Sequence, residues 1–323
     1  MRKALTVFFI AVICLLSGAH TRSLAAEKGN GSFKQQHTMM HGGIERSYLV
    51  RIPGQLKQHS SKMPLVLVLH GGGGNAAHAE RMTGFTEKAR KEGFIVVYPE
   101  GTGRLRGKLL TWNAGHCCGY AMNNRVNDVA FIDALIERLI KDYPVDPERV
   151  YVTGMSNGGM MTHRLGVELS SRFAAIAPVV ATLFGDEKKP EHPVSAIMLN
   201  GMLDEAVPPQ GGSPGGRFPD AWDGTPPKPA KEQASFWAQA NGCAATPNTS
   251  DRGTFLLSQY SCPANRAVEI YLIKDNGHAW PGGQKGSRRG DKPSSLVNGT
   301  DIIWEFFKSK ERASGTVTKE PPR

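Results

Sequence analysis

The sequence lacks an apolar run long enough to cross a bilayer. Its longest such run, Leu5 to Leu16, falls short of the roughly 20 residues that a spanning helix needs. Arg2 and Lys3 precede this run and Ser23-Leu24-Ala25 follows it, which is the pattern of a secretory signal with a small-x-small cleavage site. We therefore predict that residues 1–25 are a signal peptide, that the protein is secreted (extracellular or periplasmic), and that it has no stable membrane insertion.

The sequence is also poor in clustered metal ligands and clustered basic residues. His116, Cys117 and Cys118 are adjacent, so their side chains cannot easily converge on one tetrahedral ion. The net charge is +10, but the Lys and Arg residues are scattered, and the one tight group, at positions 285–289, lies in a Gly-rich loop. We predict no metal, no cofactor and no nucleic-acid partner, and we leave the oligomeric state open.

Cysteines are few, and four remain once the predicted signal is removed: Cys117, Cys118, Cys243 and Cys262. An even count in an exported chain suggests disulfides. The Cα atoms of Cys117 and Cys118 should lie ~3.8 Å apart, closer than in ordinary disulfides, so a bond between them would be strained. We predict a Cys243–Cys262 disulfide; the alternative is that each of these two pairs with one of Cys117 and Cys118.

Predicted strands and helices alternate along the chain, which indicates an α/β fold with a mostly parallel sheet and helices on both faces. The predicted strands are 47–52, 64–69, 94–98, 149–153, 173–181, 195–200 and 268–273. The predicted helices are 79–91, 128–143, 159–169, 231–241 and 301–308. We expect a polar tail at 26–40, one catalytic domain at 41–310 with a Gly- and Pro-rich loop or lid at 210–231, and a polar tail at 311–323.

The segment Gly154-Met155-Ser156-Asn157-Gly158 lies between a β-branched strand and a helical stretch. This context is typical of a nucleophile elbow, in which a tight turn needs glycines and exposes a serine at the end of a strand. A serine hydroxyl is a poor nucleophile unless a base takes its proton. We predict that Ser156 is a nucleophile and that a histidine activates it.

His278 is the candidate base, because it follows the strand 268–273 in a Gly-rich loop, and active sites of open α/β sheets lie at the carboxyl ends of strands. His192 precedes a strand and should lie at the opposite edge. In the order nucleophile, acid, histidine, the acid should follow the strand 195–200, and Asp204 is the candidate, with its neighbour Glu205 as the alternative.

The glycines of His70-Gly71-Gly72-Gly73-Gly74 follow another predicted strand. A tetrahedral intermediate carries an oxyanion that needs fixed N–H donors, and we assign these to the backbone of Gly72 and Asn157. Trp280 and Trp112 lie near the predicted site in sequence. We expect them to border the pocket as an apolar wall for the substrate, with loop packing as the alternative for Trp280.

The sequence resembles the PHB-depolymerase family of secreted esterases, which includes poly(3-hydroxybutyrate) depolymerases and feruloyl and acetylxylan esterases. The matching segments are HGGGGN at 70–75, YPEG at 98–101, WNAGHCCG at 112–119, VNDVAFI at 126–132, RVYVTGMSNGG at 149–159, NGMLDEAVP at 200–208, NGC at 241–243 and NGHAWPGG at 276–283. Asn127 stands where a second aspartate is expected, and residues 210–230 do not align.

This resemblance covers about residues 40–310. It implies the α/β-hydrolase fold and carries the triad roles onto Ser156, Asp204 and His278. It implies a serine carboxylic ester hydrolase whose substrate is a small or polymer-linked ester. We expect feruloyl, acetyl or other short-acyl esters of plant polysaccharide; the alternatives are a polyester depolymerase and a non-catalytic binding protein on the same fold.

Overall fold

The computed structural model describes residues 35–54, 61–213, 221–286 and 290–312. The predicted signal peptide, residues 1–25, lies outside these ranges. In chain order the elements are β1 (Gln35–His41), β2 (Ile44–Arg51), β3 (Met63–Leu69), α1 (Ala76–Thr83), α2 (Phe85–Glu92), β4 (Ile95–Pro99), α3 (Gly119–Asn123), α4 (Asp128–Asp142), β5 (Val145–Met155), α5 (Asn157–Glu168), β6 (Ala175–Val179), β7 (Ser195–Gly201), α6 (Ala230–Asn241), β8 (Asn248–Asp251), β9 (Phe255–Tyr260), β10 (Val268–Ile273) and α7 (Gly299–Phe307).

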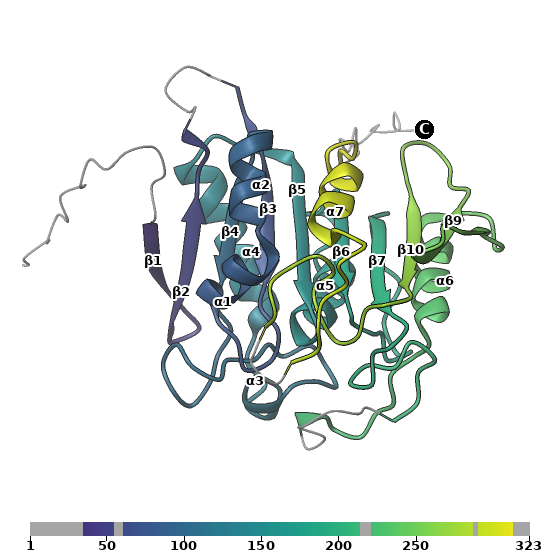
Figure 1. The fold of residues 1–323 in the computed structure, drawn as a ribbon. Coiled ribbons are helices and arrows are strands. Elements are labelled where there is room, and N and C mark those ends of the chain that lie inside the picture. The colour runs from purple at the N-terminus through teal and green to yellow at the C-terminus, as the bar shows by residue number, and fades with distance from the viewer. Residues whose placement is uncertain (1–34, 55–60, 214–220, 287–289, 313–323) are drawn as a thin grey trace, which may run out of the picture. The chain divides into compact units, whose positions relative to one another are not determined.

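The described strands form one sheet in the order β1-β2-β4-β3-β5-β6-β7-β10-β9-β8 (Figure 1). The six strands from β4 to β10 in this order are mutually parallel, and an antiparallel pair continues the sheet on each side. The mostly parallel sheet that the alternation of elements predicted is confirmed. Six parallel strands place their carboxyl ends at one edge, where the loops that carry the predicted site begin.

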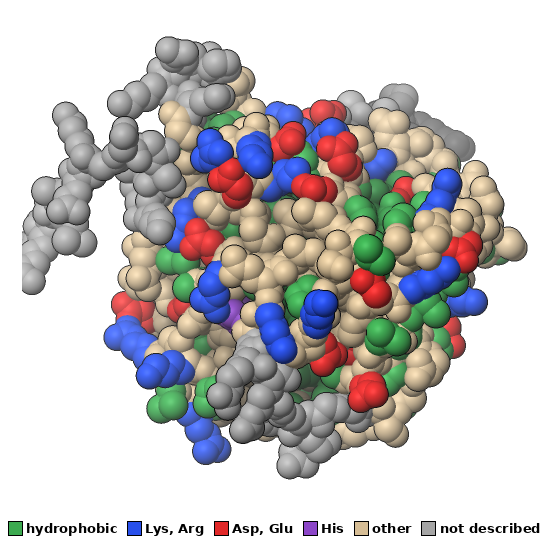
Figure 2. Space-filling view, in the orientation of Figure 1, with side chains coloured by type: hydrophobic (Ala, Val, Ile, Leu, Met, Phe, Trp, Pro, Cys, Tyr) green, Lys and Arg blue, Asp and Glu red, His purple; other side chains and the backbone are tan. Residues whose placement is uncertain are grey.

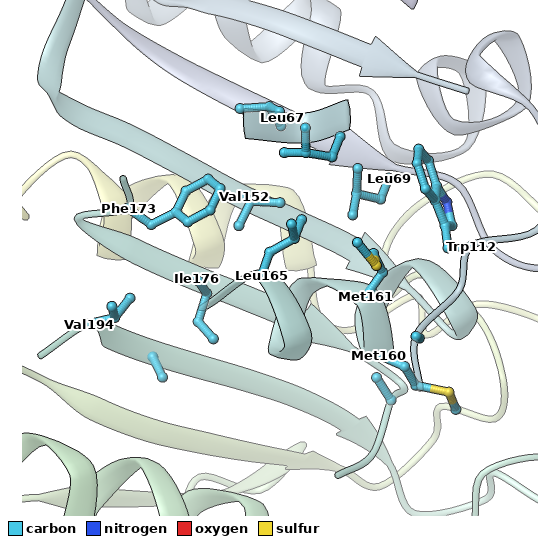
Figure 3. Packing of buried hydrophobic residues seen from close by; sticks show 14 of the residues in the cluster. Leu67, Leu69, Trp112, Val152, Met160, Met161, Leu165, Phe173, Ile176 and Val194 are labelled. Carbon is cyan, nitrogen blue, oxygen red and sulfur yellow. The ribbon is translucent and has the colours of Figure 1, made fainter. Parts of the chain in front are cut away.

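Strand β3 shows why the central strands read as unbroken apolar runs. Leu65, Leu67 and Leu69 belong to one buried cluster, which also contains buried side chains of α4, α5 and α6. Val66 and Val68 belong to a second cluster, which contains buried side chains of α1, α2 and α7. Successive strand residues point to opposite faces, so helices cover both faces and every position of the strand must be apolar. Figure 3 shows the first cluster around Leu67, Val152 and Leu165.

The fold differs from the sequence-based expectations in several places. Residues 35–40, expected in a tail, belong to β1, which pairs with β2 at one edge of the sheet. The single helix expected at 79–91 is two helices, because Gly84 adopts φ +69° and its N–H donates to the carbonyl of Glu80, which ends α1. The polar segment after Cys243 contains the β8–β9 hairpin.

The face drawn in Figure 2 carries Lys and Arg side chains among Asp and Glu side chains, most densely over α2. Arg90 and Lys91 both contact Glu87, at 2.7 and 3.7 Å, and Lys88 contacts Asp301 at 2.5 Å. Charges of opposite sign therefore balance locally along this helix. Among the described helices, none is long and apolar enough to span a membrane.

Candidate active site

Ser156 occupies the sharp turn between β5 and α5, with φ +56° and ψ −125°. A non-glycine residue at positive φ costs about 1–3 kcal/mol and persists only where its surroundings fix it. Here the Ser156 N–H donates to the carbonyl of Val179 at 2.9 Å, and its carbonyl accepts from Met160 N–H at 2.8 Å. The turn matches the nucleophile elbow that the sequence predicted.

The glycines on either side of Ser156 are required by close backbone approaches. A Cβ atom on Gly154 would lie 2.5 Å from the carbonyl oxygen of Gly158, and one on Gly158 would lie 2.4 Å from the carbonyl oxygen of His70. Both distances are far below van der Waals contact. The glycines of the motif thus let α5 begin directly against the loop that follows β3.

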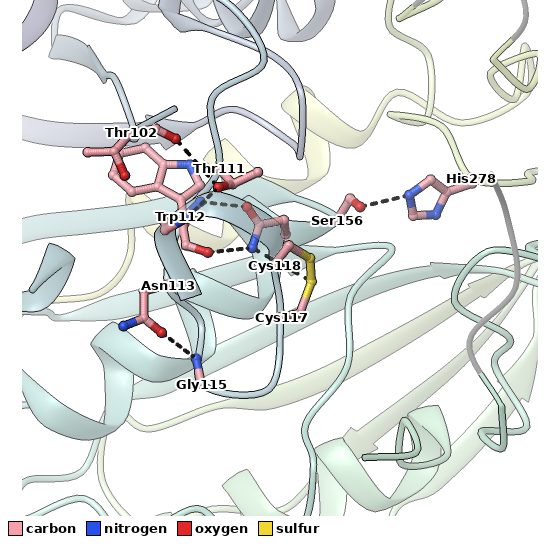
Figure 4. Close-up of a disulfide and its surroundings, with 11 residues drawn as sticks. Thr102, Thr111, Trp112, Asn113, Gly115, Cys117, Cys118, Ser156 and His278 are labelled. Carbon is pink, nitrogen blue, oxygen red and sulfur yellow. Dashed lines mark hydrogen bonds between the residues drawn. A yellow bond between two sulfur atoms is a disulfide. The ribbon is translucent and has the colours of Figure 1, made fainter. Parts of the chain in front are cut away.

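The structure brings Ser156, His278 and Asp204 together, although they lie on three different loops. His278 Nε2 lies 2.8 Å from Ser156 Oγ, and His278 Nδ1 lies 2.8 Å from Asp204 Oδ2. In the neutral tautomer that fits both contacts, Nδ1–H donates to the carboxylate and Nε2 accepts the serine hydroxyl. Figure 4 shows the Ser156 side chain directed at the imidazole.

The carboxylate of Asp204 is buried in the loop just beyond the end of β7. Its side chain is 1% exposed, and its Oδ1 accepts the backbone N–H groups of Ala206 and Val207 at 2.9 and 2.8 Å. One oxygen is thus fixed by the loop and the other faces His278. Glu205, the alternative acid, is exposed, and His192 precedes β7, at the other edge of the sheet.

The loop that carries His278 is held by two residues that the sequence analysis did not single out as functional. Asp291 accepts the His278 backbone N–H at 2.6 Å. Asn276 is fully buried, donates to the carbonyls of Gly277 and Ala279, and accepts the N–H of Ser294. Asn276 belongs to the motif NGHAWPGG, but nothing in the local sequence marks Asp291, because it is 13 residues from His278.

The two predicted oxyanion donors lie next to each other. A Cβ atom on Gly72 would be 3.7 Å from Asn157 Cβ, so the loop after β3 packs directly on the first residue of α5. Gly73 and Gly74 donate their N–H groups to the carbonyls of Leu110 and Gly71. In the described part of the chain, neither the Gly72 nor the Asn157 N–H has a protein acceptor, which leaves both able to bind an oxygen of a ligand.

His70 supports this loop as a neutral buried side chain. Burial lowers its pKa from 6.5 to about 4, so the imidazole is uncharged near neutral pH. Its Nδ1 lies 2.8 Å from the Gly71 carbonyl, and its Nε2 accepts the Gly101 N–H at 3.0 Å. The ring therefore joins the loop after β3 to the loop after β4.

The expectation that Trp112 and Trp280 form a wall for the substrate is wrong, because both side chains are buried. Trp112 is 0% exposed, belongs to the core cluster of Figure 3 and donates its indole N–H to the His70 carbonyl at 3.0 Å. Trp280 is 1% exposed, packs edge-on against Phe85 and donates to Thr300 Oγ1 at 3.0 Å. Trp280 therefore packs its loop against the core, which was the alternative stated for this residue.

The Cys243–Cys262 disulfide is present, as predicted, with the sulfur atoms 2.06 Å apart. Cys117 and Cys118 are bonded to each other (Figure 4), so the alternative pairing with Cys243 and Cys262 is wrong. The peptide bond between Cys117 and Cys118 is cis, and their Cα atoms lie 3.1 Å apart rather than at the ~3.8 Å of a trans peptide.

Asn127, the position where the family resemblance led us to expect an aspartate, is the N-cap of α4. Its side chain accepts the Ala130 N–H at 3.1 Å, a role that asparagine fills as well as aspartate. The neighbouring Asp128 is buried, pairs with Arg46 at 2.7 Å and accepts the Asn113 N–H at 2.8 Å. Asp128 therefore braces the loop after β4.

A strand-to-helix turn bearing a serine, followed along the chain by an aspartate and a histidine at the ends of later parallel strands, defines the α/β-hydrolase class. Residues 47–206 match a protein-family model described as "Esterase PHB depolymerase". The chain is 33% identical over 236 residues to the protein NocK of Nocardia uniformis subsp. tsuyamanensis, covering 68% of this chain and 66% of NocK. It is 28% identical over 248 residues to feruloyl esterase B of Piromyces equi, covering 75% of this chain and 44% of that enzyme. The chain belongs to the PHB-depolymerase family of esterases.

A solved structure, the acetyl xylan esterase from Aspergillus awamori, superimposes with a TM-score of 0.58 at 15% identity and covers 85% of this chain and 99% of its own. This likeness confirms the α/β-hydrolase fold. The chain spans between 22% and 66% of the length of the first three curated relatives it matches.

Proposed function

We propose that this protein is a secreted serine-dependent carboxylic ester hydrolase that works through an acyl-enzyme. The observation that supports this most directly is the unbroken row from Ser156 Oγ through the His278 imidazole to Asp204, with both contacts at 2.8 Å. The row links a nucleophile, a base and an orienting carboxylate at the carboxyl edge of the sheet.

In the first half of the reaction, Ser156 Oγ attacks the ester carbonyl carbon while His278 Nε2 takes the hydroxyl proton. The carbonyl oxygen becomes an oxyanion, which the N–H groups of Gly72 and Asn157 bind. Asp204 stabilises the imidazolium without taking its proton. The carbon–oxygen bond to the alcohol then breaks, and the alcohol leaves with the proton from His278.

In the second half, water replaces the alcohol. His278 takes a proton from water, the hydroxide attacks the acyl carbon, and a second oxyanion forms in the same place. Collapse of this intermediate releases the carboxylic acid, and the proton returns to Ser156 Oγ. These steps change no oxidation state, and every proton that moves is carried by His278, Ser156, water or the alcohol.

Feruloyl, acetyl or other short-acyl esters of plant polysaccharide are the substrates we propose. Similarity to feruloyl esterase B of Piromyces equi supports this class. A second candidate is poly(3-hydroxybutyrate) or a related polyester, which the description of the matching family model supports. A non-catalytic binding protein on this fold would not need Ser156, Asp204 and His278 all in hydrogen-bonding position.

The test is a hydrolysis assay of the purified mature protein on methyl ferulate, acetylated xylan and a poly(3-hydroxybutyrate) film, with Ser156→Ala as control. An organophosphonate should label the wild type at Ser156 and leave the variant unlabelled. Clearing of the film without hydrolysis of methyl ferulate or acetylated xylan would select the polyester. No labelling and no hydrolysis of any ester would reject the enzyme and favour the binding protein.

A further inference from the structure

Trp112 is bonded to both sides of the proposed oxyanion hole. Its main chain contacts Asn157, which supplies one N–H donor, and its indole contacts His70, which lies two residues before the other donor, Gly72. The side chain is completely buried. Trp112, which we predicted to contact substrate, therefore contacts the two segments that carry the proposed oxyanion donors.

The contact with Asn157 is a matched pair of hydrogen bonds. Asn157 Oδ1 accepts the Trp112 N–H at 2.7 Å, and Asn157 Nδ2 donates to the Trp112 carbonyl at 2.9 Å. The carboxamide thus pairs with the backbone of Trp112 as a neighbouring strand would. Asn157 is itself 1% exposed, and its Nδ2 also lies 3.8 Å from Cys117 Sγ. The first residue of α5 is therefore fixed through its side chain, while its own N–H stays free for a ligand.

The contact with the loop after β3 uses the other end of the same tryptophan. The indole N–H donates to the His70 carbonyl at 3.0 Å, and the ring lies 5.1 Å from the His70 imidazole. That carbonyl oxygen is the atom that a Cβ on Gly158 would approach to 2.4 Å, so it also marks the contact between the loop and α5. Moving the indole would move the chain that presents Gly72.

A third contact holds Trp112 itself in place. The Arg46 guanidinium lies 5.9 Å from its ring centroid and is paired with buried Asp128, which also accepts the N–H of Asn113, the next residue. Trp112 therefore has fixed partners at its ring, its indole nitrogen and its backbone. These partners belong to β2, α5 and the loop after β3, and Asp128 of α4 holds Arg46 in place.

We propose that Trp112 and the Asn157 carboxamide are positioning residues that set the distance between the two oxyanion donors; this rests on the proposed esterase function. Both N–H groups must lie about 2.7–3.1 Å from the oxyanion to stabilise it. Gly72 and Asn157 lie on separate segments. One buried residue, hydrogen-bonded to Asn157 through its backbone and to the His70 carbonyl through its indole, fixes their separation before the substrate arrives.

The first experiment compares Trp112→Phe with Trp237→Phe. Trp237 is a matched control, because it is also 0% exposed and donates its indole N–H, at 3.0 Å, to His163 Nδ1 rather than to the oxyanion framework. Both variants lose one buried indole N–H, and both should unfold at a lower temperature. We expect kcat to fall by roughly 10- to 100-fold in Trp112→Phe only, as a small misplacement of a catalytic group costs up to about 100-fold, with KM changed less than about twofold.

The second pair is Asn157→Ala and Asn241→Ala. Asn241 is likewise buried and donates to two backbone carbonyls, those of Val194 and Trp237, each at 2.8 Å. Asn157→Ala keeps the backbone N–H donor but removes its support, and we expect the same loss of kcat. We expect Asn241→Ala to lose stability only.

Two further readouts separate positioning from general damage. All kcat values are taken per active site titrated with the organophosphonate, so unfolded molecules are not counted. Phenylboronic acid, which forms a tetrahedral adduct with an active serine, should bind more weakly to Trp112→Phe and Asn157→Ala in proportion to their loss of kcat/KM. A wild type that hydrolyses no ester and takes no label would reject the proposed function itself.

The positioning role is overturned if Trp112→Phe and Asn157→Ala keep wild-type kcat, or lose no more of it than Trp237→Phe and Asn241→Ala. It is also overturned if the loss is in KM alone or if the boronic acid binds all variants equally. A loss of kcat and of boronic acid affinity in either test variant beyond its control supports it.

Discussion

The carboxylate of Asp291 accepts the backbone N–H of His278 at 2.6 Å, so the histidine that contacts Ser156 is held through its main chain as well as through Asp204. Asp291→Ala should lower kcat by roughly 10-fold, because the imidazole would be positioned less tightly. KM should change little. Asp291→Asn keeps an oxygen acceptor and should recover most of the activity; equal loss in both variants would make the carboxylate charge, and not this hydrogen bond, the cause.

The triad variants test the assignment of each role. Ser156→Ala and His278→Ala should each lower kcat on the order of 10⁴-fold or more, and the double variant should lose little beyond either single one, because the residues act as a unit. Asp204→Asn should also be severe. Steady-state rates on one soluble ester measure all four.

Glu205→Gln is the control for Asp204→Asn. Glu205 is the next residue and is exposed, so its variant should keep near wild-type kcat. An inactive Glu205→Gln together with an active Asp204→Asn would exchange their roles.

The close backbone approach at the nucleophile elbow leaves no room for a side chain at Gly158. In Gly158→Ala the added carbon would lie 2.4 Å from the His70 carbonyl oxygen, so α5 and the loop after β3 must separate. We expect about 1–3 kcal/mol of lost stability, as for other overpacked sites, and a lower kcat. Gly286→Ala is the control, since its added carbon would meet side-chain atoms at 3.5 Å or more. If Gly158→Ala has the same free energy of unfolding in urea and the same kcat as the wild type, the close approach is contradicted.

Because His70 and His163 are buried and neutral, we expect the folded protein to lose stability in acid. Burial lowers the pKa of His70 to about 4 and that of His163 to about 3, whereas both should titrate near 6.5 in the unfolded chain. The unfolded chain therefore binds more protons below pH 6.5, and the stabilisation present above that pH is lost as pH falls towards the folded-state values. Between pH 7 and 5 each histidine should cost about 2 kcal/mol, measured by urea unfolding.

His163→Gln separates the two contributions. His163 lies in α5 and contacts Gln233 and Trp237. The variant is less stable at pH 7, but its free energy of unfolding should fall by about 2 kcal/mol less between pH 7 and 5 than that of the wild type, since position 163 no longer takes up a proton on unfolding. An unchanged slope would mean that His163 is not neutral in the folded protein.

The Cys243–Cys262 disulfide closes a segment with a sequence separation of 19. Replacing both cysteines with serine should lower the free energy of unfolding by roughly 3 kcal/mol on the chain-entropy model. The kcat per titrated site should not change. Peptide mapping without reduction checks the pairing, and a peptide that joins Cys117 to Cys243 would contradict it.

The sequence predicted those parts of the site that follow from strand ends and chain order. The run Pro64–Leu69 is apolar at every position because helices cover both faces of β3, and Ser156, Asp204 and His278 each follow a recognisable strand. Parallel strands then place their loops at one edge, which brings residues 122 positions apart into contact. This inference needs no knowledge of side-chain packing.

The environment of the two tryptophans could not be predicted in the same way. Trp112 lies in a long loop, and whether its ring faces solvent or core depends on how that loop folds back towards His70, which no local periodicity encodes. Asp291 depends on a contact of the same kind. The split between α1 and α2 was more accessible, since Gly84 lies inside an otherwise helical pattern.

Cys243 lies just after α6 and Cys262 just after β9, so their disulfide encloses the whole β8–β9 hairpin. The tip of this hairpin, residues 251–253, is exposed, and exposed loop tips are the preferred sites of proteolytic nicking. A single cut there leaves both new chain ends attached through the sulfur bridge. Strand β10, which leads to His278, remains tied to α6, and a molecule nicked at this edge keeps both parts of its Ser156–His278 contact in one covalent structure.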